Sequence, residues 1–174
     1  MVSEFSVRAA SVEDAPCLAV AERETARTPG LLRSTPAELS DVAFATRIEQ
    51  LESPGMRGRY LVAVDARGAL VGHALLDPMP LIQCAHVFRL TIVVHPGHTS
   101  RGVGRVLMNA LLAWASEHER LEKIELLVRS TNARAIRLYE SCGFVAEGRL
   151  RRVIKLPSGD YVDDIAMAWH RIEQ

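Results

Sequence analysis

Residues 93–105 have the sequence VVHPGHTSRGVGR, in which a β-rich run ends and a glycine pair opens an amphipathic helix. The first turn of a helix exposes main-chain N–H groups without intrahelical partners and carries a partial positive charge. Glycine at positions 102 and 104 lets the main chain approach a phosphate closely. Arg101 and Arg105 add two guanidinium groups, which bind phosphate oxygens well. The segment therefore predicts a pyrophosphate-binding turn.

Two nucleotide-binding patterns fail at named positions of this turn. A Walker loop needs Gly-Lys-Ser/Thr where this chain has Gly104-Arg105-Val106. The dinucleotide fingerprint needs a third glycine, and this chain has Leu107 there. A glycine pair before a helix also occurs for packing alone, so the turn does not identify its ligand by itself.

A second pattern lies in residues 132–144, which have the sequence NARAIRLYESCGF. Asn132 and Tyr139 are spaced so that they share one face of a helix. Asn132 stands at the start of that helix, and Tyr139 can present its hydroxyl to a leaving group. Each residue alone has an ordinary explanation, as a capping asparagine and a half-buried tyrosine. The second pattern is therefore informative mainly in combination with the first.

The two segments, in this order, resemble the signature of the GCN5-related N-acetyltransferases, the GNAT superfamily. Residues 99–104 are similar to its pyrophosphate loop, Arg/Gln-x-x-Gly-x-Gly/Ala, with Thr99 where the family usually has Arg or Gln. Residues 132–144 fill every fixed position of Asn-x-x-Ala-x-x-x-Tyr-x-x-x-Gly-Phe. Three further segments, at 71–73, 85–87 and 147–163, resemble the bacterial branch that includes L-amino-acid and phosphinothricin-type N-acetyltransferases.

The resemblance implies a mixed α/β (α+β) fold, the GNAT fold, in a single domain at residues 1–174. Such a fold has a central sheet of about seven strands, splayed between its fourth and fifth strands, and about four flanking helices. The hydrophobic periodicity of the chain agrees with this architecture. It predicts strands at 5–9, 60–64, 70–76, 87–94, 124–129, 144–156 and 161–169. It predicts helices at 12–26, with a Ser11–Asp14 capping box, at 36–51, capped by Ser34 or Thr35, at 103–118 and at 132–141.

The resemblance also implies acetyl-CoA as the cofactor and direct attack of a neutral amine on its thioester. Asn132 is then expected to contact the pantetheine arm, and Tyr139 to protonate the CoA thiolate as the general acid. The residues expected at the cofactor are Ile92, Val93, Val94, Thr99, Ser100, Arg101, Gly102, Val103, Gly104, Arg105, Asn132, Ala135 and Tyr139. Three alternatives stay open: an inactive relative that only binds CoA, a plain phosphate-ligand binder, and an enzyme that acetylates protein N-termini or lysines.

The general base is the missing part of this signature. An amine is mostly protonated near neutral pH, so a base or a water chain must remove a proton before attack. Many family members carry a glutamate where this chain has Arg89, which cannot act as a base. An imidazole has a suitable pKa, and the candidates near this strand are His73, His86, His95 and His98. We take His86 as the first candidate, with a strand-edge histidine bonded to a loop, or deprotonation by bulk water, as alternatives.

Arg89 bears on the identity of the acceptor. If the 87–94 strand has the orientation usual in the family, the guanidinium points into the acceptor side of the cleft. There it would repel a polyamine and bind a carboxylate through two parallel hydrogen bonds. This favours a small amine that also bears a carboxylate, such as an amino acid. The alternative is that Arg89 pairs with a structural acid on a neighbouring strand.

Composition limits the remaining classes. The chain has 174 residues, of which 48% are hydrophobic and 24% charged, a size and mix typical of one globular domain. Lys+Arg and Asp+Glu both number 21, and this zero net charge disfavours nucleic acid as a partner. The sequence has no signal-peptide pattern, no membrane-spanning apolar run, and no metal or disulfide pattern among its three cysteines. We therefore expect a cytoplasmic enzyme that acts on a small-molecule amine without a metal, and a homodimer is a possible assembly.

Overall fold

The computed structural model describes residues 4–54 and 57–171, which form a seven-stranded mixed sheet and four α-helices. The strands are β1 (Phe5–Ala9), β2 (Arg59–Asp65), β3 (Leu70–Pro78), β4 (Val87–Val94), β5 (Lys123–Arg129), β6 (Val145–Lys155) and β7 (Tyr161–His170). The helices are α1 (Ala15–Ala26), α2 (Asp41–Glu52), α3 (Val103–Glu117) and α4 (Ala133–Ser141). None of the helices in these described ranges is long and apolar enough to cross a membrane.

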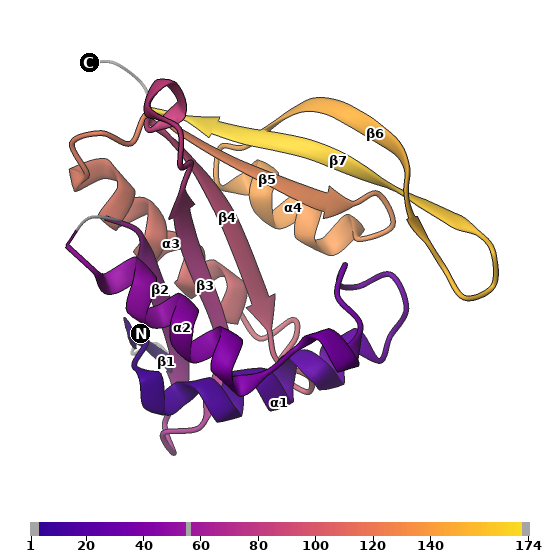
Figure 1. Ribbon diagram of the computed structural model, residues 1–174, viewed down its shortest axis with the longest axis horizontal. Helices are drawn as coiled ribbons and strands as arrows, with labels where there is room; N and C mark the ends of the chain where they lie inside the picture. Colours follow the sequence, from indigo (N-terminus) through magenta and orange to yellow (C-terminus); the bar gives the residue numbers. More distant parts are fainter. Residues whose placement is uncertain (1–3, 55–56, 172–174) are drawn as a thin grey trace.

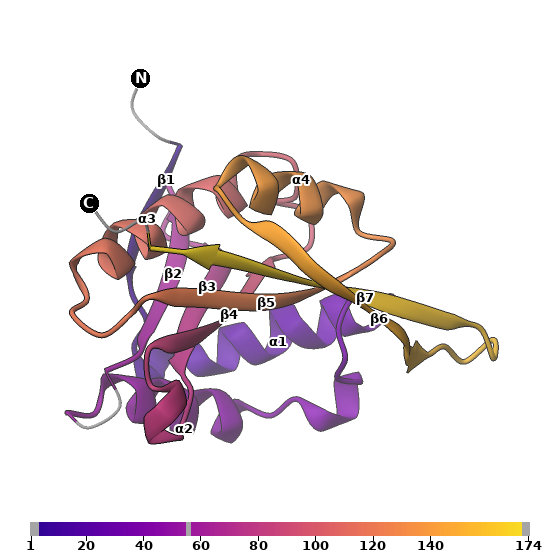
Figure 2. The same ribbon diagram turned by 90° about the horizontal axis from the view of Figure 1, so that it is seen from above.

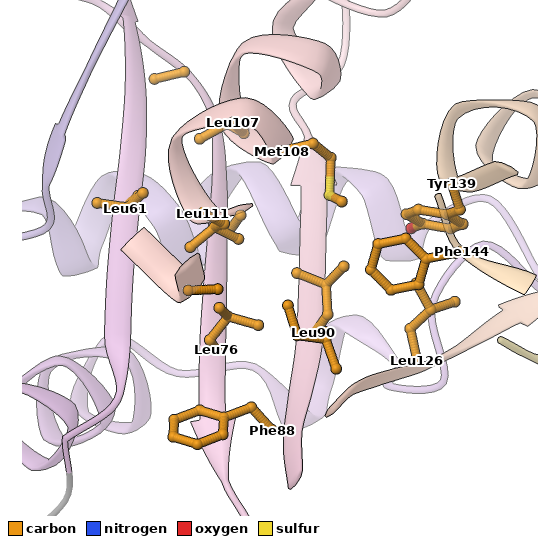
Figure 3. Close-up of a cluster of buried hydrophobic side chains, with 14 of the residues drawn as sticks. Leu61, Leu76, Phe88, Leu90, Leu107, Met108, Leu111, Leu126, Tyr139 and Phe144 are labelled. Carbon is orange, nitrogen blue, oxygen red and sulfur yellow. The ribbon is translucent and has the colours of Figure 1, made fainter. Parts of the chain in front are cut away.

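The sheet lies between two layers of helices (Figure 2). Helices α3 and α4 cover one face, and α1 and α2 cover the other. The alternation of side chains along β2 serves both layers: Leu61 packs in the cluster under α3, and Tyr60 and Val62 pack in the cluster under α1 and α2. The α3 side holds the larger core, in which Phe88 and Met108 are fully buried (Figure 3).

The sheet opens in the middle, between β4 and β5. The strand order is β1-β2-β3-β4-β5-β7-β6, and only the β4–β5 neighbours are parallel. Their ladder ends at the Arg89–Glu125 pair, whereas β3 stays paired with β4 as far as Val94. On its other side, β5 stays paired with β7 as far as Arg129. The two strands therefore diverge beyond Arg89 (Figure 1), which confirms the predicted splay.

The second helix differs from its prediction. Residues 36–38 form a separate 3-10 turn, which Thr35 and Glu38 close with a capping box. Leu39 is extended, so the chain leaves the helical conformation before α2 begins. Ser40 then caps α2, and its Oγ accepts a hydrogen bond from the Ala43 amide at 3.2 Å. The capping box predicted at Ser11 and Asp14 is confirmed, although it caps a short 3-10 turn that leads into α1.

Strand β6 forms one edge of the sheet and, with β7, extends beyond the helices as a long hairpin (Figure 1). Ten of its eleven residues are exposed, the exception being Ile154, which is half-buried. Its register with β7 shifts between Leu150 and Ile154, and Arg152 within that bulge has a φ of 55°.

Candidate active site

Two cavities adjoin where β4 and β5 diverge. The larger, about 710 Å³, lies over the N-terminus of α3 and is called the α3 cavity below. The smaller, about 570 Å³, extends toward α1 and the loop at residues 31–34 and is called the α1 cavity. Ile92, Val93, Asn132 and Tyr139 line both. A ligand that passes through the opened sheet would therefore contact both cavities at these residues.

The turn before α3 has the geometry of an anion cradle. Ser100 and Gly102 have φ angles of 63° and 90°, and Gly102 is the N-cap of α3. A Cβ built on Gly102 would meet no protein atom within 4 Å, so a side chain there would project into open space at the cavity. The amides of the first turn of α3 have no intrahelical acceptors. The residues at this turn thus fit the pyrophosphate of CoA, and Thr99, Ser100, Val103, Gly104 and Arg105 also line the α3 cavity.

Gly104 also lies at a close packing contact between α3 and α4. A Cβ at this position would lie 2.9 Å from Leu138 Cδ2 on α4 and 3.6 Å from Val94 Cγ2 on β4. Real Cβ contacts at 2.9 Å are essentially not seen, so the missing side chain lets α3 and α4 approach each other. This contact holds the two signature segments side by side.

The two arginines of the turn have different surroundings. The Arg101 guanidinium turns away from the cavity, pairs with Glu4 and lies 5.3 Å from the centroid of the Phe5 ring. Arg105 lines the α3 cavity, and its Nη2 donates to Ser141 Oγ at 2.6 Å. Arg101 is therefore not among the residues that line the α3 cavity.

Two arginines that the motifs did not identify also line the α3 cavity. Arg134 and Arg137 both lie on α4, opposite the turn. Arg134 Nη1 donates to Ser100 Oγ at 3.3 Å, so it reaches across to the phosphate cradle. A spacing rule within one helix could not predict this contact, because it joins two segments across the cavity.

Asn132 and Tyr139 lie at the junction of the cavities, as their shared helix face predicts. Asn132 Oδ1 accepts a hydrogen bond from the Ala135 amide at 3.1 Å and thereby caps α4. Tyr139 is 7% exposed, and burial raises its pKa to about 12. Among the described residues its hydroxyl has no hydrogen-bond partner. A neutral phenol O–H is therefore available at the junction as a donor.

The α1 cavity has a lining of mixed charge. Arg89 lies in it, and both Nε and Nη2 donate to Glu125 Oε1 at 3.2 Å. Glu125 is the cross-strand neighbour of Arg89 on β5, so this is the pairing with a neighbouring acid that the sequence left open. The other charged residues of the lining are Glu22, Arg33, Arg129 and Glu147.

The structure does not bring His86 to either cavity. His86 is exposed and immediately precedes β4, at the end where the β4–β5 ladder is closed. Its main-chain oxygen accepts hydrogen bonds from the amides of Glu122 and Lys123. Alternation along a strand predicts which face a residue occupies, but not how far along the strand the sheet opens. His86 therefore lies outside the lining of both cavities.

Two other histidines, which are buried and line neither cavity, contact each other. His73 and His95 are 0% and 4% exposed, and His73 Nδ1 lies 3.1 Å from His95 Nε2. His73 Nε2 lies 2.8 Å from Glu22 Oε1, and His95 Nδ1 lies 3.1 Å from the Leu70 main-chain oxygen. Burial, and next the charge of His73, lower the pKa of His95 to about 4. A chain of hydrogen bonds thus runs from the wall of the α1 cavity into the protein.

Sequence reasoning missed Glu22, although α1 carries a signal for it. Ala15, Leu18 and Ala19 form the buried stripe of α1, and Glu22 continues the same spacing. A carboxylate on the apolar face of a helix requires a partner or a function.

Comparison with known proteins agrees with this geometry. Residues 27–144 match the model of the acetyltransferase (GNAT) family. The L-amino acid N-acetyltransferase of Escherichia coli is 32% identical over 67% of this chain and 70% of its own length. Spermidine N(1)-acetyltransferase of Vibrio cholerae is 37% identical over 53% of this chain and 52% of its own length. The crystal structure of a GNAT phosphinothricin acetyltransferase from Sinorhizobium meliloti, in complex with acetyl-CoA, has a TM-score of 0.85 at 20% identity and covers 96% of this chain and 88% of that one.

Proposed function

The chain belongs to the GNAT family and is an acetyl-CoA-dependent N-acetyltransferase, and from this premise we propose that its acceptor is a small primary amine that also bears a carboxylate. The observation that carries the proposal is the mixed charge of the α1 cavity. Its volume of about 570 Å³ suits a small molecule. Glu22 offers a carboxylate to an ammonium group. Arg33, which pairs with Asp164, and Arg89, which pairs with Glu125, are the guanidiniums that can also bind a carboxylate.

Two relatives point to different acceptors, and the lining favours one of them. The Escherichia coli relative is named for L-amino acids and the Vibrio cholerae relative for spermidine. A polyamine carries only positive charge, and Arg33 and Arg89 would repel part of it. An amino acid or a similar compound places one charge of each sign among residues of both signs.

Each part of the signature has a role in this proposal. Acetyl-CoA supplies an acyl thioester when bound. The first turn of α3 and Arg105 hold its phosphates through main-chain amides and a guanidinium. The main chain of Ile92–Val94 has lost β5 as a partner and can hydrogen-bond the pantetheine arm. Tyr139 holds a proton at its hydroxyl and can donate it to the leaving thiolate.

A panel of amines tests the proposal. The wild-type chain is assayed with acetyl-CoA and amino acids, the matching decarboxylated amines, spermidine, and a peptide with a free N-terminus. We expect kcat/KM to be highest for a carboxylate-bearing amine. A preference for spermidine over every such amine would contradict the proposal. Acetylation of none of them, together with a rise in Tm on adding acetyl-CoA, would favour a module that only binds CoA.

A further inference from the structure

We propose that Glu22 binds the ammonium group of the acceptor and takes its proton, and that His73 and His95 hold Glu22 in position for this step. The inference rests on the proposed function, because it treats the α1 cavity as the acceptor site. It assigns the role of the general base, which Arg89 cannot perform, to a residue that lines the cavity, whereas His86 lines neither cavity.

Glu22 and Tyr139 reach one cavity from opposite faces of the sheet. Glu22 stands on α1 and Tyr139 on α4, which cover different faces (Figure 2). Both line the α1 cavity, because the divergence of β4 and β5 opens a passage between the two layers. A proton acceptor on one side and a proton donor on the other is the arrangement that amine attack and thiolate departure require.

The burial of Glu22 gives it a defined orientation. Its side chain is 12% exposed, and it follows the apolar stripe of α1. Oε1 is bonded to His73, whereas Oε2 has no hydrogen-bond partner among the described residues. One carboxylate oxygen is thus held by the protein and the other is left for a ligand.

The hydrogen bonds fix where the protons of this chain lie. The Leu70 oxygen can only accept, so His95 Nδ1 carries a proton and donates it. His95 stays neutral at neutral pH, so its Nε2 accepts from His73 Nδ1. His73 then shares a second proton, at Nε2, with Glu22 Oε1. The Glu22–His73 pair therefore shares one proton, and two further hydrogen bonds fix its orientation.

The proton transfer is balanced in charge. The ammonium approaches Oε2 of Glu22, one N–H bond breaks, and an O–H bond forms on Oε2. The positive charge passes from the acceptor nitrogen to the Glu22–His73 pair, so the net charge of the site does not change. The nitrogen is left with a lone pair, which can attack the thioester carbonyl carbon.

The groups that face this pair are consistent with a polar ligand. Tyr60 is fully buried on β2, its hydroxyl has no partner among the described residues, and burial together with the charge of Glu22 raises its pKa. It is therefore a neutral O–H donor beside Glu22. Arg47, ion-paired with Asp77, faces Tyr60 from α2. Arg33, Arg89 and Glu125 face the same cavity from its other walls.

The test compares Glu22→Gln with wild type, using the amine that wild type acetylates best. Glu49→Gln is the control, because Glu49 is exposed on α2, outside both cavities, and the substitution removes the same charge. We expect Glu22→Gln to lower kcat/KM by roughly 10²–10⁴-fold, the usual size for a lost general base. The logarithm of kcat/KM for Glu22→Gln should then rise with pH, with a slope of one, up to the pKa of the acceptor amine in solution. We expect formate to restore part of the activity of Glu22→Ala.

Two further measurements separate a catalytic role from a structural one. Glu22→Gln should keep the wild-type rise in Tm on adding acetyl-CoA, which shows that it is folded and binds the cofactor. His73→Gln, as a change in a positioning residue, should alter the pH profile in the same direction as Glu22→Gln. An unchanged kcat/KM and pH profile in Glu22→Gln would overturn the proposal.

An NMR measurement keeps the two proposals distinguishable. In wild type, adding ethylamine should move the ¹⁵N shifts of the His73 ring nitrogens. In Glu22→Gln the amine should leave these shifts unchanged. Wild-type acetylation of small amines with no His73 response would refute this inference alone. A clear His73 response in a chain that acetylates no small amine would refute the proposed function and leave the amine site standing.

Discussion

Replacing Gly102 with alanine tests the phosphate cradle directly, because this glycine has a φ of 90° and borders the α3 cavity. The added Cβ would meet no protein atom within 4 Å, so the substitution creates no clash in the folded chain. It adds a methyl group where we expect phosphate oxygens to contact main-chain amides. Gly68 is a matched control: its φ is 80°, its added Cβ is equally free, and it lies in the turn between β2 and β3.

The expected loss of stability follows from the backbone conformation. A non-glycine residue in the left-handed region costs on the order of 1–2 kcal/mol. At roughly 2–4 °C per kcal/mol for a chain of this size, each variant should melt about 2–8 °C below wild type. Acetyl-CoA at about 100 times its Kd should stabilise wild type by about 2.7 kcal/mol. The corresponding rise in Tm is roughly 5–11 °C.

Thermal unfolding with and without acetyl-CoA measures both effects in one experiment. Each variant serves as its own reference, because the compared quantity is the rise in Tm caused by the ligand. We expect Gly68→Ala to keep the wild-type rise and Gly102→Ala to lose most of it. Equal rises in the two variants would refute the assignment of this turn to the phosphates.

Three further predictions concern the junction, the acceptor and the buried histidines. Tyr139→Phe should lower kcat by roughly 10²–10⁴-fold in single-turnover assays while calorimetry finds acetyl-CoA binding unchanged; an unchanged chemical step would leave Tyr139 a packing residue. If the guanidinium binds the carboxylate of the acceptor, Arg89→Ala should raise KM about tenfold or more for an amino acid but not for its decarboxylated amine. Equal effects on the two substrates would mean that Arg89 serves only in its ion pair with Glu125. Burial holds the pKa of folded His95 at about 4, below its ordinary value of about 6.5. The folded chain therefore binds fewer protons than the unfolded chain, and the free energy of unfolding should fall as pH drops through this window, by up to about 1.4 kcal/mol per pH unit. The free energy of unfolding, measured with urea, should depend less on pH in His95→Asn than in wild type. Identical pH dependences in the two proteins would contradict this assignment.

The cofactor side of the site was predictable because its information is local. The phosphate cradle comes from one turn and the first residues of α3, and Asn132 and Tyr139 share one short helix. Spacing along the chain is sufficient for both. The close contact of Gly104 with Leu138 was not predictable in this way, because it depends on how α3 and α4 pack.

The acceptor side was not predictable, because it is assembled across the sheet. Glu22, His73 and His95 come from α1, β3 and the turn after β4. Antiparallel pairing of β3 with β4 brings the two histidines together, and the packing of α1 on the sheet adds Glu22. The position of His86 outside both cavities was not predictable for a related reason, because its face on the strand was inferred without knowing where the β4–β5 ladder ends. The start of α2 was misplaced because Leu39 adopts an extended conformation within an otherwise helical pattern.

The exposed edge strand β6 has a consequence for self-association. Its eleven residues offer unpaired main-chain groups along one side, a surface on which a strand of another molecule can form hydrogen bonds. Arg149, Arg151 and Arg152 place positive charge along this edge, and the bulge between Leu150 and Ile154 bends it. Both features oppose the growth of an intermolecular sheet. Replacing both arginines in the double variant Arg149→Thr, Arg151→Thr would weaken this protection. We expect this variant to aggregate at concentrations where the wild-type chain stays in solution.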